Sequence, residues 1–255
     1  MKTIRAIYVT SSVTYVKDNY RCLVESLCNP STRPHGVEGA ALVLLRIPPA
    51  YVLKNGFGLI ALGAPDVGFA LLRNLLSSYS HDPRVAAAER AGMKVFRCNN
   101  VNRDEALSFF RSLDPDLIVN MRTRNIYKAP ILGLPKIGCI NIHHGLLPDH
   151  RGTMCDLWGW ASGKPVGFTI HRMNEKIDDG RILVRREVPT QGVRSYIEIP
   201  LRSSRLEAES LTFVLERFAE NPGWEGYPNQ RAALPHTKNP SPAQIAEWRR
   251  KGLRL

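Results

Sequence analysis

The chain has 255 residues, of which 44% are hydrophobic, and it carries a formal net charge of +12 at pH 7. This length suits one large domain or one domain with an appendage, and the apolar fraction is ordinary for a globular protein. No run of about 18 apolar residues is free of charge, so we expect no transmembrane segment. The basic excess favours anionic partners, such as nucleotide-linked substrates, the glutamate tail of a folate, tRNA or an anionic membrane surface.

Strand-like and helix-like segments alternate along the first 190 residues. Asp82 and Pro83 are expected to begin one helix, which Gly92 ends, and Asn102 is expected to cap another. The alternation predicts a doubly wound, mostly parallel, Rossmann-like α/β sheet with helices on both faces. The predicted strands span residues 2–10, 39–47, 93–98, 117–120, 138–142, 166–172 and 182–188, and the predicted helices span 18–27, 83–90 and 103–112.

The pattern changes after Val188, where a long amphipathic stripe begins. We predict a helix that Ser203 or Ser204 caps and that runs through Phe218, followed by a loop over residues 221–238. We therefore divide the chain into a main domain over residues 1–190 and a small helical C-terminal extension over residues 191–255 that packs on it.

A second helix is predicted near the end of the chain. Ser241 and Gln244 form a capping box around Pro242, and Gly252 ends the helix. Helical spacing predicts that Ile245 and Trp248 face inward, while the arginines of this basic segment face solvent.

The five cysteines form no C-x-x-C pair, and the first residues do not resemble an apolar leader peptide. We therefore expect reduced thiols in a cytoplasmic protein. The histidines and cysteines near His144 fit no standard zinc spacing, so no metal site is predicted; they are Cys139, His150, Cys155 and His171.

The segment from Gly138 to Leu183 holds the side chains best suited to chemistry. Asn141 and His143 stand two residues apart, so on a strand they project from one face. They also lie at the carboxyl end of that strand, where open α/β sheets bind ligands. Asp178 lies in a turn between two later strands. An amide, an imidazole and a carboxylate can together stabilise an oxyanion and move a proton, as acyl transfer to an amine requires.

Several ordered motifs resemble the formyltransferases that use 10-formyltetrahydrofolate. These include the sugar N-formyltransferases, glycinamide ribonucleotide formyltransferase and the catalytic domain of methionyl-tRNA formyltransferase. The family motifs correspond here to Asn141-Ile142-His143, Leu146-Leu147-Pro148, Arg151-Gly152 and Asp178-Asp179-Gly180. The resemblance covers residues 84–188 well. It departs at His144, where many relatives have proline, and over residues 29–80, whose middle cannot be aligned.

The resemblance implies a fold and a set of roles. The fold is that of the formyltransferases, with residues 1–190 as the catalytic domain. Asn141 would donate a hydrogen bond to the formyl oxygen as it becomes negative, and His143 would move the proton that the amine loses. Asp178, rather than Asp179, would pair with His143.

The resemblance also implies a site for 10-formyltetrahydrofolate as co-substrate. Main-chain groups of two loops would hold it, and these loops comprise Asn125, Ile126 and Tyr127, and Asn174, Glu175 and Ile177. Arg122 and Arg124 lie in the first of these regions, where they would either meet phosphate or glutamate or remain in a solvated basic loop.

We therefore expect an N-formyltransferase that moves a formyl group from 10-formyltetrahydrofolate to a primary amine. We expect the acceptor to be a small molecule, either an amino sugar on a nucleotide or a related biosynthetic amine. The assembly that we consider is a homodimer. The alternatives are an enzyme resembling methionyl-tRNA formyltransferase, which the short tail disfavours, a formyltetrahydrofolate hydrolase, and a non-catalytic binder of folate or nucleic acid. Gly56-Phe57-Gly58 holds half of a dinucleotide fingerprint, which alone is a weak signal.

Overall fold

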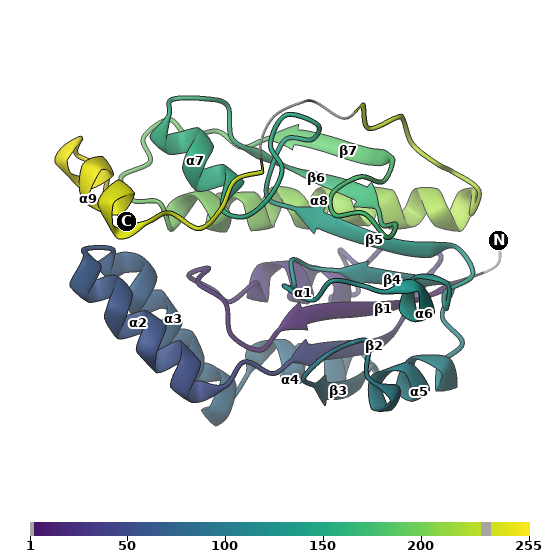
Figure 1. Ribbon diagram of the computed structural model, residues 1–255. Helices are drawn as coiled ribbons and strands as arrows, with labels where there is room; N and C mark the ends of the chain where they lie inside the picture. Colours follow the sequence, from purple (N-terminus) through teal and green to yellow (C-terminus); the bar gives the residue numbers. More distant parts are fainter. Residues whose placement is uncertain (1–2, 231–235) are drawn as a thin grey trace.

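The computed structural model describes residues 3–230 and 236–255, and its centre is a seven-stranded sheet in the order β3-β2-β1-β4-β5-β6-β7 (Figure 1). The start of the predicted first strand, Lys2, and residues 231–235 of the predicted loop lie outside the described residues. The strands are β1 (Ile4–Ser11), β2 (Val37–Leu45), β3 (Lys94–Cys98), β4 (Leu117–Asn120), β5 (Gly138–His143), β6 (Gly167–Arg172) and β7 (Ile182–Glu187).

The first five strands pair in parallel, whereas β6 pairs antiparallel with β5 and β7 pairs antiparallel with β6. The helices are α1 (Arg21–Cys28), α2 (Pro49–Leu62), α3 (Pro65–Ser80), α4 (Pro83–Arg90), α5 (Asp104–Ser112), α6 (Ala129–Leu132), α7 (Cys155–Ala161), α8 (Glu198–Glu220) and α9 (Pro242–Arg250). The prediction of a doubly wound, mostly parallel sheet with a helix at the C-terminal end is confirmed.

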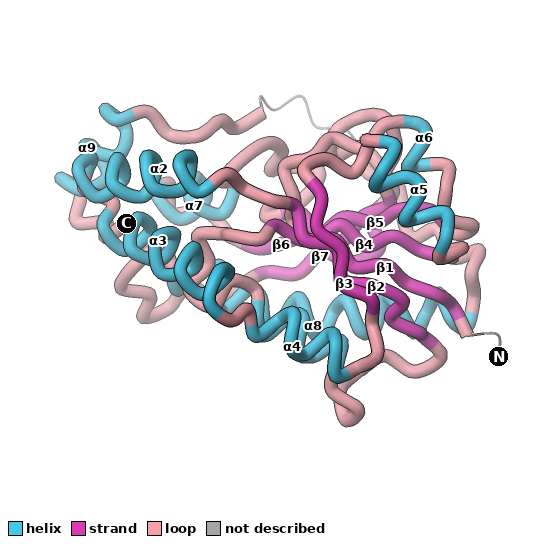
Figure 2. The backbone as a smooth tube through the Cα atoms, turned by 90° about the horizontal axis from the view of Figure 1, so that it is seen from below, coloured by secondary structure: helices cyan, strands magenta, loops and turns pink. Residues whose placement is uncertain are grey.

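Helices cover both faces of the sheet (Figure 2). α5 and α6 lie on one face, where Phe110 and Ile131 pack against Ile118 of β4. α1, α4 and α8 lie on the other, where Leu23 and Phe218 belong to the larger apolar cluster. Because β1 is buried on both faces, its sequence is a nearly continuous apolar run rather than an alternating one. The boundary at residue 190 stays a prediction; α8 itself contacts α1, β2, β6 and β7.

Two predicted helix caps differ from the structure. α8 begins at Glu198, so Ser203 and Ser204 lie inside it, where Ser203 donates to the Glu207 carboxylate and Ser204 to the Leu201 carbonyl. A serine inside a helix is tolerated when its hydroxyl finds such a partner. Asn102 does not cap α5, because its side chain instead bonds the backbone of Ile126 and Lys128.

Asp82 caps α4 as predicted, since its side chain accepts from the Arg84 backbone N–H. The same carboxylate forms a buried ion pair with the Arg84 guanidinium at 2.7 Å. The guanidinium also donates to the carbonyls of Ser11 and Ser12, which fixes the loop that follows β1.

The stretch that could not be aligned with the family contains a helical hairpin, α2 and α3, which lies beyond the end of the sheet (Figure 1). Glycines let the two helices approach closely. A Cβ at Gly68 would lie 2.6 Å from the carbonyl oxygen of Gly56, closer than side chains ever pack. Gly56 is therefore a helix-packing residue, and Gly56-Phe57-Gly58 lies inside α2, whereas a dinucleotide fingerprint needs a turn between strand and helix.

α9 begins with the predicted capping box and buries the predicted face. Ile245 and Trp248 are 4% and 6% exposed, and the Trp248 ring meets Trp158 edge to face at 4.9 Å. Arg249 and Arg250 are exposed, as predicted. All five cysteines are free thiols. In the part of the chain that the structure describes, no helix has the length and apolar character needed to cross a membrane.

A clasp joins the hairpin to the segment that follows α9. Asp66, at the start of α3, accepts from the side chains of Ser195 at 2.6 Å and Arg254 at 2.7 Å. The backbone N–H of Asp66 donates to the carbonyl of Leu255, and the N–H of Tyr196 donates to the carbonyl of Arg254. We refer to Asp66, Ser195, Arg254 and Leu255 as the clasp.

Candidate active site

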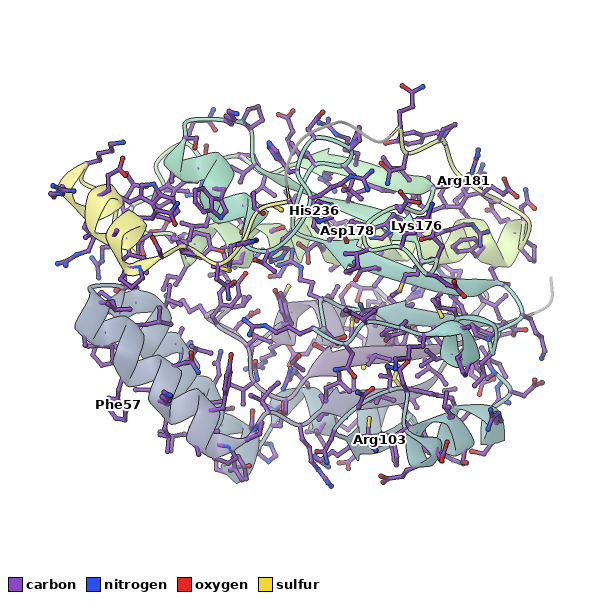
Figure 3. The ribbon with its side chains drawn as sticks, in the orientation of Figure 1. Phe57, Arg103, Lys176, Asp178, Arg181 and His236 are labelled. Atoms are coloured by element: carbon purple, nitrogen blue, oxygen red, sulfur yellow. The ribbon has the colours of Figure 1, made fainter. Side chains whose placement is uncertain are left out.

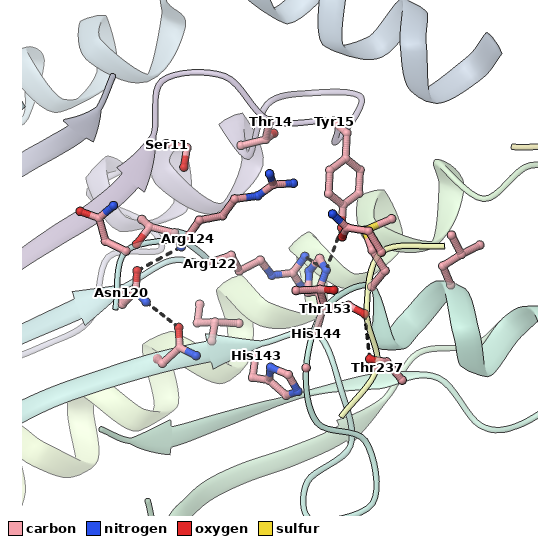
Figure 4. Close-up of a pocket in the computed structure, with 18 of the residues that line it drawn as sticks. Ser11, Thr14, Tyr15, Asn120, Arg122, Arg124, His143, His144, Thr153 and Thr237 are labelled. Atoms are coloured by element: carbon pink, nitrogen blue, oxygen red, sulfur yellow. Dashed lines mark hydrogen bonds between the residues drawn. The ribbon is translucent and has the colours of Figure 1, made fainter. Parts of the chain in front are cut away.

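The sheet brings Asn120, Asn141 and His143 to the carboxyl ends of two neighbouring strands. Figure 4 shows Asn120 and His143 at this edge. Asn120 is the last residue of β4 and lies directly beside Asn141 of β5 in the parallel register. All three side chains line a cavity of about 850 Å³. A ligand site at this edge is what an open α/β sheet predicts.

Neighbouring side chains fix the orientation of the Asn141 amide. Asn120 Nδ2 donates to Asn141 Oδ1 at 2.9 Å, so the Asn141 oxygen points at β4. On the other side, His171 Nδ1 lies 2.7 Å from the Arg172 carbonyl, which can only accept, so Nδ1 carries the ring proton. His171 Nε2 therefore accepts from Asn141 Nδ2 at 3.2 Å. The second N–H of Asn141 is left able to donate to a ligand oxygen in the cavity.

His143 is held by a similar constraint. Its Nε2 lies 2.8 Å from the carbonyl oxygen of His150, and since that oxygen only accepts, Nε2 is the donor. Its Nδ1 lies 3.5 Å from Asp178 Oδ1 and is the nitrogen able to gain or lose a proton. Gly145 makes this arrangement possible, because a Cβ there would lie 2.5 Å from both His143 Nε2 and the His150 oxygen.

The two carboxylates of the acidic turn, Asp178 and Asp179, have different partners. Asp178 is 8% exposed, has a left-handed backbone (φ 51°) and accepts weakly from the Gly152 N–H at 3.4 Å. Asp179 lies instead 3.7 Å from Arg151 and accepts from Asn174. The structure thus places Asp178, and not Asp179, beside His143. The catalytic roles of Asn141, His143 and Asp178 stay predictions.

The two loops predicted to hold folate both line the cavity. Ile126 and Ile177 are large apolar side chains that are 61% and 52% exposed, so they present apolar surface to a ligand. Tyr127 is 3% exposed and packs in the core beneath its loop, and Asn125 accepts from the Val101 N–H, so both support the loop. Asn174 and Glu175 are exposed on the other loop. In Figure 3, Lys176 and Asp178 lie together at the centre of the molecule.

Arg122 and Arg124 behave differently from each other. Arg124 is exposed, lines the cavity and donates to the Tyr51 hydroxyl at 3.1 Å. The Arg122 side chain is 6% exposed and pairs with Glu207 of α8, so it is neither a solvated cation nor a free phosphate site. Burial lowers the pKa of Arg122.

His144 takes part in the same buried network. Its Nδ1 lies 2.7 Å from Arg122 and 3.3 Å from Asp156, and its ring meets the Tyr20 ring edge to face. Burial raises the pKa of Asp156 above its ordinary value. His144 therefore has polar neighbours of its own, and we find no group of three or more metal-ligating side chains among the described residues.

Sequence reasoning missed Asn120 and His171 as parts of this site. Asn120 was visible only as the polar end of a buried strand, and its contact with Asn141 depends on strand pairing between distant segments. His171 lies opposite Asn141 in the antiparallel pairing of β5 and β6. A polar residue at the end of a buried strand is the local signal that could have identified Asn120.

Known proteins resemble this chain in sequence over more than half of its length. A sequence model of the Formyl transferase family matches residues 73–215, more than half of the chain. Methionyl-tRNA formyltransferase from Thermotoga neapolitana is 31% identical over 169 residues, which cover 66% of this chain and 53% of that protein. Methionyl-tRNA formyltransferase from Akkermansia muciniphila is 37% identical over 106 residues, which cover 41% and 34%. The chain thus spans about half the length of the curated relatives it matches first.

Solved structures share the fold. Glycinamide ribonucleotide transformylase 1 from Symbiobacterium toebii superposes with a TM-score of 0.60 at 16% identity, covering 86% of this chain and 88% of that one. A sugar N-formyltransferase from Shewanella sp FDAARGOS_354 has a TM-score of 0.54 at 20% identity, covering 93% and 76%. At these identities the likeness establishes the architecture of the sheet and helices.

Proposed function

The chain belongs to the formyltransferase family, and from this premise we propose that it transfers a formyl group from 10-formyltetrahydrofolate to a primary amine. The observation that carries the proposal is the convergence of three groups on one cavity: the second N–H of Asn141, Nδ1 of His143 and the carboxylate of Asp178. Members of the family use this folate as formyl donor, and the exposed side chains of Ile126 and Ile177 fit the flat, apolar faces of a pterin.

The residues divide the work of transfer as follows. Asn141 donates to the formyl oxygen while the amine nitrogen bonds to the formyl carbon and the oxygen becomes negative. His143 Nδ1 accepts the proton that the amine loses and returns it to the folate nitrogen as that carbon–nitrogen bond breaks. Asp178 stabilises the imidazole while it is charged. The products are a formamide and tetrahydrofolate, so atoms and protons balance.

Substitution of the central side chains tests this proposal. We expect His143→Ala and Asn141→Ala to lower turnover by about 10²-fold or more with the fold intact, as for loss of a proton-transfer group or an oxyanion donor. Tetrahydrofolate release with a panel of primary amines is the measurement. Asp179→Asn is the matched control for Asp178→Asn and should keep most of the activity. The mechanism would be contradicted if His143→Ala turned over at a rate close to that of the unaltered chain.

We propose a small-molecule amine as the acceptor, with an amino sugar on a nucleotide as the form expected from the sequence and a cytoplasmic location. A tRNA acceptor is the second candidate, because the relatives most similar in sequence carry that name and the chain is strongly basic. A mobility-shift assay with initiator tRNA at physiological ionic strength separates the two. Tight and discriminating binding would favour tRNA, and its absence together with formylation of a small amine would favour our proposal.

A further inference from the structure

The cavity extends beyond the predicted catalytic residues to the α2–α3 hairpin. From the hairpin and the chain that packs on it, aliphatic side chains form one wall: Val52, Leu59, Leu62, Leu71, Ile245 and Leu255. We call these residues the apolar wall. Most of it precedes residue 73, where the family match begins. The wall is therefore a property of this chain rather than of the matched region.

Several polar groups near the apolar wall are already engaged. In the loop after β1, the Ser12 N–H donates to the Leu45 carbonyl and the Thr14 N–H donates to Asn19, at 2.8 Å each. A phosphate-binding loop needs such N–H groups to be unengaged. Within the hairpin, the Arg73 guanidinium donates to the Lys17 carbonyl, and Asp66 is held in the clasp.

The cations that line the cavity supply little charge for a phosphate beside the wall. Among the described residues they are Arg122, Arg124 and Lys176, together with histidines. Arg122 is neutralised by Glu207, and Lys176 belongs to the loop that also carries Ile177. Arg124 is exposed and donates to the Tyr51 hydroxyl, so a diphosphate against the wall would lose water and gain one solvent-screened cation in exchange.

We propose that the acceptor amine is carried by a molecule with an uncharged aliphatic or aromatic group, which packs against the apolar wall, and not by the nucleoside diphosphate that the sequence had led us to expect. This inference rests on the proposed function, because it takes the amine to be the group that reaches Asn141 and His143. The clasp holds the hairpin and its wall over this part of the cavity.

The test uses the full chain and a series of N-alkylformamides as product mimics, which avoids the protonation of free amines. With tetrahydrofolate present, affinity measured by calorimetry should rise about fourfold for each methylene from methyl to butyl, as for a buried alkyl group. Leu59→Asn and Leu71→Asn should each reduce the butyl-over-methyl preference by about tenfold. Leu76→Asn is the matched control, since Leu76 lies on the same helix as Leu71 but is 71% exposed and outside the cavity. It should leave the preference unchanged.

The outcomes separate the inference from the function on which it rests. Suppose that 5-formyltetrahydrofolate binds but affinity does not change from the methyl to the butyl formamide, or that a nucleotide-linked amino sugar binds more tightly than the alkyl compounds. Either result would overturn the apolar acceptor and would leave the proposal of formyl transfer intact. Failure to bind any folate would overturn both. If one wall variant does not fold, as melting would reveal, the other variant and the alkyl series still decide the question.

Discussion

At the scale of single residues, the direction of one amide decides what Asn141 can do. Asn120 donates a hydrogen bond to the side-chain oxygen of Asn141, and His171 accepts one from its NH2 group. The remaining N–H of Asn141 therefore has a defined direction. A donor positioned before the reaction begins does not have to reorient as charge develops.

Asn120→Asp tests this orientation. Aspartate keeps an oxygen for the Thr123 N–H, which Asn120 binds at 3.1 Å, but it cannot donate to Asn141 when ionised. We expect kcat to fall by about tenfold with a smaller change in KM for the folate, because the lost orientation matters most as the oxygen becomes charged. Steady-state kinetics measures this, with exposed Asn221→Asp as control. An unchanged kcat would mean that His171 alone orients Asn141.

His171 should make stability depend on pH. Burial, together with the nearby His143, lowers the pKa of His171 from 6.5 to about 4. The unfolded chain therefore binds this proton at a higher pH than the folded chain does. The stability that neutral His171 provides is present above about pH 6.5 and is lost as pH falls towards 4.

Melting temperatures between pH 7 and pH 5 check this sign. We expect the unaltered chain to lose stability over that range, by an amount on the order of 1 kcal/mol from this residue. His171→Gln should flatten the dependence, whereas His35→Gln, at an exposed histidine, should not. A stability that rises on acidification through this range would contradict the neutral imidazole on which the Asn141 geometry depends.

At the scale of elements, local sequence patterns were sufficient to predict a helix or strand where its buried face or its capping residues determine it. The strand over residues 117–120 and the capping box at Ser241 appear as predicted, because apolar runs and N-cap chemistry are local properties. The hairpin could not be predicted, since it depends on close backbone approach at Gly56 and Gly68. Ser203 was misread as a cap because its partner, Glu207, satisfies it within the helix.

The candidate site divides in the same way. The sequence motifs identified Asn141, His143 and Asp178, which the structure brings to one cavity. Asn120 and His171 enter through pairing across strands, which no single segment encodes. Arg122 was expected either to meet a ligand anion or to remain in a solvated basic loop, and its burial against Glu207 depends on the position of α8.

The clasp provides a prediction at this scale. Burial alone would raise the pKa of Asp66, but hydrogen bonds from Arg254 and Ser195 lower it below its ordinary value. Asp66→Asn should weaken the attachment of the hairpin and lower the melting temperature modestly, because the Arg254 partner is largely exposed. It should also raise KM for the acceptor more than KM for the folate. Glu247→Gln, which removes the exposed pair with Lys251, is the control and should leave both KM values unchanged. Equal effects on the two KM values would mean that the clasp does not serve the acceptor end of the cavity.

At the scale of the whole molecule, the folded chain should bind folate and the unfolded chain should not. A ligand at 100 times its Kd then adds about 2.7 kcal/mol to the free energy of unfolding by mass action. We expect 5-formyltetrahydrofolate to raise the melting temperature in a concentration-dependent manner, as measured by calorimetry. No rise at millimolar folate would contradict the donor assignment.

The clasp also makes ionic strength matter for a ligand that carries no charge. The Arg254 side chain is 67% exposed, so dissolved ions can screen its attraction to Asp66 over the Debye length of about 8 Å at 0.15 M salt. Salt would weaken the attachment of the hairpin through the clasp, while slightly strengthening the hydrophobic effect itself. Affinity for an uncharged acceptor would then fall as salt rises, through a bond that the acceptor never touches.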